Sequence, residues 1–192
     1  LILREASENF DWSDISPTIF GAVFESTLNP ETRRSGGMHY TSIENIHKVI
    51  DPLFLNDLRA ELAEIQQIPV VRTRRSRLEA FQEKLAGLTF LDPACGSGNF
   101  LTETYLSLRR MENEIVRSLI DAREGRTKDQ RDQITAGQIM WGITDSTVLE
   151  PIKVSIQQFY GIEINDFAAT VAKTALWIAE SQMMKQTEEI VH

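Results

Sequence analysis

The segment LTFLDPACGSGNF, residues 88–100, joins a short apolar run to a turn of small residues. The apolar run at 88–91 has a β-strand-like composition, and it ends at Asp92. The turn contains Gly96 and Gly98, which have no Cβ and let a ligand approach the backbone closely. Because an amphipathic helix pattern follows, the turn is expected to present free backbone N–H groups at a helix start. Strand, glycine turn and helix in this order predict the beginning of a parallel α/β sheet.

A second strand-like run covers residues 159–163 and also ends in an acid, Glu163. It precedes a helix that Asp166 can cap, with apolar residues that form one continuous stripe. The stretch between the two acids is more than twice the roughly 30 residues of a compact βαβ unit. We therefore expect inserted structure near residues 123–150. Residues 88–192 then read strand, glycine turn, helix, insertion, strand, helix.

The first 87 residues predict short helices. Thr41-Ser42-Ile43-Glu44 has the pattern of a capping box, and Asp51-Pro52 has that of a second helix start. Pro69 ends the run that follows, and a further helix is expected over residues 72–86. The sequence therefore predicts a helical part, residues 1–87, before the α/β part.

Composition excludes several classes of protein. With 192 residues, 42% of them hydrophobic, the chain fits one large domain or one domain plus a smaller helical part. Twenty Lys and Arg against 28 Asp and Glu give a net charge of −8, which does not favour a self-sufficient nucleic-acid binder. No apolar stretch reaches the roughly 20 residues of a membrane helix, so no membrane partner is expected. The single cysteine favours a reducing, cytoplasmic location.

The turn itself indicates a class of ligand. A dinucleotide fingerprint needs Gly or Ala where this chain has Leu101, and the lysine of a phosphate-binding loop is absent. Asp92 at the strand tip repels phosphate and suits an ammonium group. A nucleoside that carries an amino acid fits better, since Glu163 at the next strand tip can accept hydrogen bonds from both ribose hydroxyls. S-adenosylmethionine has this structure.

At these residues the sequence resembles a known family. Residues 92–100, DPACGSGNF, resemble the cofactor motif of DNA adenine methyltransferases that modify the exocyclic amine, and residues 159–165, FYGIEIN, resemble their second motif. Residues 34–42, RSGGMHYTS, resemble the motif that precedes the cofactor strand in the gamma-ordered class. With the flanking helices, the similarity is closest to MmeI-like (type IIL) restriction–modification enzymes, over about residues 10–186. The resemblance implies an α/β, Rossmann-like S-adenosylmethionine-dependent methyltransferase domain, truncated here and preceded by an α-helical segment.

The resemblance also implies which residues bind the cofactor. They are Tyr40, Thr41, Asp92, Pro93, Ala94, Gly96, Gly98, Asn99, Phe100, Glu163 and Ile164. The first two are expected to hold the methionine end of S-adenosylmethionine, which the turn also lines. Glu163 is expected to bind the ribose, and Ile164 to pack on the adenine. No catalytic residue and no metal site is assigned.

The family's adenine-binding motif, Asn/Asp-Pro-Pro-Tyr/Phe, is absent, because none of the six prolines are adjacent. Because the chain also begins at Leu1, we expect a piece of a longer protein that is inactive alone. The full enzyme would bind double-stranded DNA, flip an adenine and methylate its amine. The alternative is a non-catalytic interaction module, in which residues 10–87 dock onto other domains and the turn is vestigial. A truncated sheet would also leave a strand edge through which two chains could pair.

Four other features are interpreted as structural. Cys95 is expected to fill the turn rather than to act as a nucleophile, because no base lies nearby in the sequence. His47 is expected to be structural or on the surface. Trp141 and Trp177 are expected in the core, and the arginines within residues 72–77 on a solvated helix face.

Overall fold

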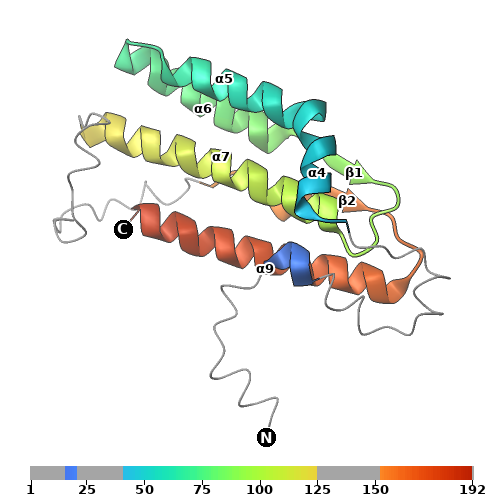
Figure 1. Cartoon of the computed structure of the whole chain (residues 1–192). Coiled ribbons are helices and arrows are strands. Elements are labelled where there is room, and N and C mark those ends of the chain that lie inside the picture. Colours follow the sequence, from blue (N-terminus) through green and yellow to red (C-terminus); the bar gives the residue numbers. More distant parts are fainter. Residues whose placement is uncertain (1–15, 21–40, 125–151, 192) are drawn as a thin grey trace, which may run out of the picture.

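The structure is a computed structural model that describes residues 16–20, 41–124 and 152–191 of the chain. These residues form a mostly helical body with a two-stranded parallel sheet at one end (Figure 1). Tyr40, Trp141 and most of the predicted insertion near 123–150 lie outside the described residues, so these predictions are not tested. None of the described helices is both long enough and apolar enough to cross a membrane.

Helix α4 (Ile43–Ile50) continues into α5 (Asn56–Gln66) through a π-helical turn, η2 (Asp51–Leu55). The side chain of Ser42 caps α4 by accepting a hydrogen bond from the Asn45 N–H at 3.4 Å, so the cap lies one residue later than predicted. The predicted second helix start at Pro52 is wrong. The chain stays helical there, because proline has no N–H group that would need an acceptor and the wider π turn accommodates its ring.

Helix α6 (Val71–Gly87) follows Pro69 within a residue of its predicted bounds and packs against α5. Helix α7 (Asn99–Glu124) lies at the centre, where α4, α6 and α9 (Asp166–Val191) all contact it. The predicted apolar stripe of α9 is confirmed as its buried side. The cap of α9 is Asn165 rather than Asp166, because its side-chain oxygen accepts from two backbone N–H groups at 3.0 and 3.1 Å.

Strands β1 (Phe90–Asp92) and β2 (Phe159–Gly161) pair in parallel, as predicted, although both are shorter than the runs that predicted them. A 3-10 turn, η4 (Ile156–Gln158), leads into β2. On the inner face the ring of Phe90 stacks on that of Phe159, with 5.2 Å between the ring centroids. The rings of Phe159 and Tyr105 on α7 are T-shaped, with 5.6 Å between their centroids. The outer face carries exposed apolar side chains.

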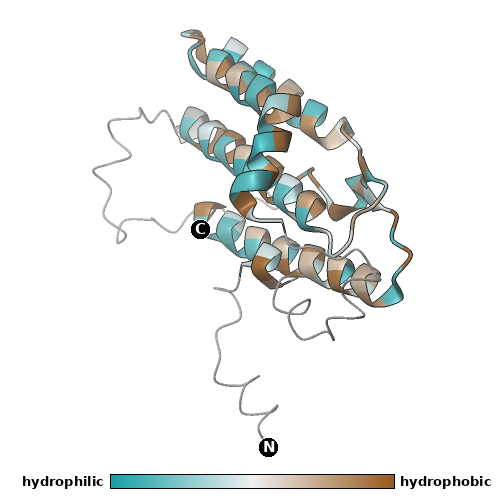
Figure 2. Cartoon of the chain, turned by 45° about the vertical axis from the view of Figure 1, so that its right-hand side comes forward, coloured by the Kyte–Doolittle hydropathy of each residue, from teal (hydrophilic) through white to brown (hydrophobic). Residues whose placement is uncertain are grey.

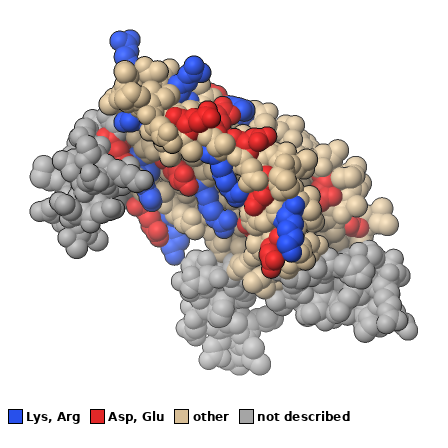
Figure 3. All heavy atoms as spheres, turned by 45° about the horizontal axis from the view of Figure 1, so that its top comes forward, with Lys and Arg blue, Asp and Glu red and all other residues tan. Residues whose placement is uncertain are grey.

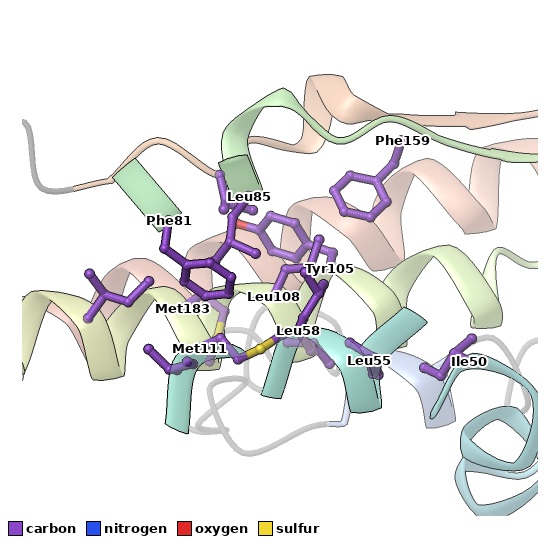
Figure 4. Packing of buried hydrophobic residues seen from close by; sticks show 14 of the residues in the cluster. Ile50, Leu55, Leu58, Phe81, Leu85, Tyr105, Leu108, Met111, Phe159 and Met183 are labelled. Carbon is purple, nitrogen blue, oxygen red and sulfur yellow. The ribbon is translucent and has the colours of Figure 1, made fainter. Parts of the chain in front are cut away.

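One hydrophobic cluster runs through both predicted parts of the chain. Figure 4 shows side chains of α5, α6, α7, α9 and β2 pointing toward one another. In Figure 2 hydrophobic and hydrophilic positions alternate along the helices, as expected for helices with one buried side. The prediction that Trp177 is core is wrong, because the buried side of α9 uses small residues and Trp177 is 62% exposed.

A buried ion pair, Arg109 with Glu112, lies on α7 within this core, and both residues are fully buried. The Glu112 carboxylate also accepts from the Gln82 side chain on α6 at 2.9 Å and from the Val154 N–H at 3.2 Å. Arg109 donates to the Thr187 hydroxyl on α9 at 2.8 Å. The pair thus ties two helices and the segment leading to β2 onto the central helix.

Candidate cofactor site at the ends of the parallel strands

The two predicted site acids lie at the same edge of the sheet. Asp92 is the last residue of β1 and is level with Gly161, the last residue of β2. The Ile162 N–H donates to the Asp92 carbonyl at 2.9 Å, which extends the pairing one step beyond the strands. Glu163 follows directly, and both acids are partly exposed. The predicted arrangement of two acids at the tips of neighbouring parallel strands is therefore confirmed.

The turn after β1 is held by its own hydrogen bonds. The Asp92 carboxylate accepts from the Ala94 N–H at 3.0 Å, and the Cys95 N–H donates to the Ile162 carbonyl at 3.1 Å. The Gly98 N–H donates to the Cys95 carbonyl at 2.8 Å. Several of the amides expected to be free are thus already used within the chain, and they give the turn a defined shape.

One hydrogen bond joins the two motifs directly. The Gly96 N–H donates to Oε2 of Glu163 at 2.9 Å, and the Asn165 N–H donates to Oε1 of the same carboxylate at 2.8 Å. These bonds orient the carboxylate. Since each carboxylate oxygen can accept two hydrogen bonds, Glu163 keeps acceptor capacity for a ligand.

The two glycines of the turn have different surroundings. Both have positive φ, +54° at Gly96 and +79° at Gly98, a region that glycine adopts without strain. A Cβ on Gly98 would lie 2.8 Å from the Cβ of Ala172, so Gly98 allows α9 to pack against the turn. A Cβ on Gly96 would meet nothing within 4 Å. The open space at Gly96 is therefore on the side where a ligand can approach.

Cys95 reports the charge of this edge. Burial raises the pKa of its thiol, and the nearby carboxylates of Asp92 and then Glu163 raise it further. The sulfur is therefore held as a neutral thiol with little nucleophilic character, which agrees with its interpretation as a filler of the turn. Both acids thus affect the pKa of the same thiol, that of Cys95 in the turn.

The remaining predicted residues occupy varied positions. Gly98 and Asn99 are buried, whereas Pro93 and Ala94 are exposed. Ile164 is 94% exposed beside Glu163. Thr41 is partly buried just before α4, and no hydrogen bond joins it to the turn in the described part of the chain. The structure thus brings the two acids and the glycine turn together and leaves the role of Thr41 as a prediction.

Two residues of this site were not singled out from the sequence. Asn165 orients Glu163 through its N–H while its side chain caps α9, and asparagine is a favoured residue at an N-cap. Thr102 lies one turn after Asn99 on α7, and the side-chain oxygens of both are buried without a partner among the described residues. Only the three-residue spacing could have linked Thr102 to Asn99, and that spacing alone is a weak signal.

Comparisons with known proteins show what the chain is similar to. A family model described as MmeI, DNA-methyltransferase domain, matches residues 68–192. DNA methyltransferase A of Bacillus subtilis (strain 168) is 38% identical over 191 residues, which is all of this chain and 18% of that protein. A solved structure of the type IIL restriction–modification enzyme MmeI in complex with DNA has a TM-score of 0.71 and 41% identity, and the match covers 95% of this chain and 21% of that one. The chain spans about a fifth of the length of these two relatives.

Proposed function

The chain belongs to the MmeI DNA-methyltransferase family, and on this premise we propose that it is the cofactor-binding region of a site-specific DNA adenine methyltransferase. The enzyme would be part of a restriction–modification system and would transfer a methyl group from S-adenosylmethionine to the exocyclic amine of adenine. In this proposal the two strands begin a Rossmann-like sheet that residues outside this chain complete. A cytoplasmic location, which rests on the single cysteine, belongs to the same proposal.

The hydrogen bond from the Gly96 N–H to Glu163 carries this proposal. It joins the glycine turn after one strand to the acid after the neighbouring parallel strand. Ligands of open α/β sheets bind at this carboxyl edge. A ligand seated there can touch the turn with one end and the acid with the other, as an amino acid linked to a nucleoside requires.

The residues present fit S-adenosylmethionine. The partly exposed carboxylate of Asp92 suits the ammonium group of the methionine end, and the open space at Gly96 admits the ligand close to the backbone. Ile164 offers an exposed apolar side chain beside Glu163 on which adenine can pack.

When bound, S-adenosylmethionine would supply a methyl group on a positively charged sulfur. This chain's residues would bind and orient it, and none of them is proposed as a general base. Methyl transfer also requires the target amine to be held in line with that methyl group, and the motif that does this in the family is absent here. We therefore expect no DNA methylation by the 192-residue chain alone.

Double-stranded DNA is the proposed partner of the full-length protein. On the face shown in Figure 3, basic side chains alternate with acidic ones and do not form a broad basic surface. Phosphate contacts dominate DNA affinity and require clustered basic groups. Because the chain as a whole carries a net charge of −8, most of the DNA contacts are proposed for parts of the full-length protein outside this chain.

Titration of the 192-residue chain with S-adenosylmethionine by calorimetry tests the proposal. Binding should weaken about 10- to 100-fold in Asp92→Asn and in Glu163→Gln, because each change removes hydrogen bonds to a charged group. Asp57→Asn, an exposed acid on α5, is the matched control and should bind as the unchanged protein does. Absence of binding, or binding that neither substitution weakens, would favour the interaction module with a vestigial turn.

A further inference from the structure

Glu103 is a buried carboxylate that the proposed cofactor site does not use. It lies on α7 one turn after the glycine turn, and it is 3% exposed. Its Oε2 accepts from the Thr18 hydroxyl at 3.2 Å. Its Oε1 lies 3.2 Å from Nε2 of His47 and 3.3 Å from a guanidinium nitrogen of Arg110. Segments far apart in the sequence thus converge on one acid of the helix that follows the glycine turn.

His47 on α4 lies between two carboxylates. Its Nδ1 is 2.8 Å from Oδ1 of Asp51, which Arg59 on α5 also contacts at 3.0 Å. A protonated imidazole can donate to both acids at once. A neutral ring can donate to only one of them and turns a lone pair toward the other. The polar contact between His47 of α4 and Glu103 of α7 therefore depends on the charge of one ring.

The charged groups that face His47 come from η2, α5 and α7. The acids are Asp51, Glu103 and, across the shared cavity, Glu114, and the bases are Arg59 and Arg110. The hydrogen bond from His47 lowers the pKa of Asp51 most, burial opposes this, and Arg59 lowers the pKa further, so that the pKa lies below its ordinary value. Asp51 is therefore ionised over the range in which a histidine changes charge.

The position of α4 on α7 bears on the cofactor site. Figure 1 shows α4 crossing α7 near the end of α7 that follows the glycine turn. Thr41 and the capping residue Ser42 stand directly before the first turn of α4. A shift of α4 relative to α7 would therefore move Thr41 relative to the turn.

We propose that His47 is a positioning residue whose protonated ring, bound to Glu103 and Asp51, holds α4 on α7 and thereby strengthens cofactor binding at the glycine turn. The contact has both hydrogen bonds while the ring is charged and only one of them while it is neutral. The link to cofactor binding rests on the function proposed above. The docking of α4 by itself does not.

Two measurements on the 192-residue chain, at pH about 6 and about 8, test this inference. The first is hydrogen–deuterium exchange of α4 without cofactor, expressed as protection factors so that the intrinsic pH dependence of exchange is removed. The second is the Kd for S-adenosylmethionine. From the lower to the higher pH, the protection factors of α4 in the unchanged protein should fall about fivefold, and the Kd for S-adenosylmethionine should rise about fivefold. This change is at the low end of typical coupling between sites.

His47→Gln should remove the pH dependence, with low protection and weak binding at both pH values. Glu103→Gln should have the same effect through the other partner. Lys48→Gln is the matched control, because it removes a positive charge from the exposed side of α4 and should keep the full pH dependence.

Equal protection of α4 at both pH values in the unchanged protein would overturn the inference, as would a pH dependence that survives in His47→Gln. A Kd that does not change with pH while the protection of α4 does would also overturn the inference, since the docking of α4 would then have no effect on cofactor binding. Protection that follows pH in a chain that binds no cofactor at either pH would instead refute the proposed function and leave the docking intact.

Discussion

Glu112 in the core and the acids at the strand tips are all carboxylates, yet their surroundings differ. Glu112 is fully buried, and its oxygens accept hydrogen bonds from three separate segments of the chain. Asp92 and Glu163 are partly exposed. The hydrogen bonds that they accept come from backbone N–H groups of the turn after β1 and of the segment after β2. A carboxylate whose acceptor capacity the chain itself uses fixes structure. One with capacity left at an open edge can bind a ligand.

The largest expected effect is the loss of stability when the core carboxylate is removed. Glu112→Ala should lower the free energy of unfolding by about 3–5 kcal/mol, because it leaves the buried Arg109 charge without its partner. Urea denaturation followed by circular dichroism measures this change. Glu114→Ala, an exposed acid on the same helix, is the matched control and should stay within about 0.5 kcal/mol. Equal effects of the two changes would remove the distinction between core and edge carboxylates.

The two glycines of the turn repeat the comparison on a smaller scale. Gly98→Ala should cost about 2–4 kcal/mol, from backbone strain at positive φ and from collision with Ala172. Gly96→Ala meets open space and should cost only the strain, about 1–2 kcal/mol. The same denaturation measurement applies to both.

Gly87→Ala serves as the control for these glycines, because its added Cβ meets nothing and its φ is ordinary. It should leave stability unchanged or slightly improved. If Gly96→Ala proved as damaging as Gly98→Ala, the open side of the turn would have to be packed against protein.

The smallest expected effect concerns the charge of the strand edge. Because burial and the two acids raise the pKa of Cys95, less thiolate is present at a given pH, and alkylation by iodoacetamide at pH about 8 should be slower than that of a free cysteine. Asp92→Asn removes one negative charge and should speed the reaction by less than about tenfold. Mass spectrometry of the single cysteine gives the rates. A slower reaction in Asp92→Asn would contradict a negative edge.

Much of the fold could be predicted from local patterns. The glycine turn with its flanking strand and helix, the second strand ending near Glu163, and the stripe of α9 all follow from spacing that involves only neighbouring residues. Pro52 could not be placed from the sequence because a wider π turn lets the helix continue through it, and Trp177 could not because the buried side of α9 uses small residues. Asn165 was passed over in favour of the acid beside it, although both are good capping residues.

The buried charges could not be predicted in the same way. Glu112 depends on Gln82 and Val154, and Glu103 depends on Thr18 and His47, all distant along the chain. In the sequence such acids look like ordinary polar positions of a long helix. Only the assembled core shows which of them are enclosed. The candidate site was predictable because its acids follow strands, and the edge at which parallel strands end is known in advance.

The π-helical turn at Asp51–Leu55 sets the rotational phase between the two helices it joins. A π turn amounts to one residue more than an α-helix would use, and each residue of an α-helix advances by about 100°. Deleting a single residue there would restore an unbroken helix and rotate α4 by about that angle relative to α5. His47 would then move away from Glu103 while α5 kept its packing. The one additional residue of the π turn therefore sets which side of α4 faces α7.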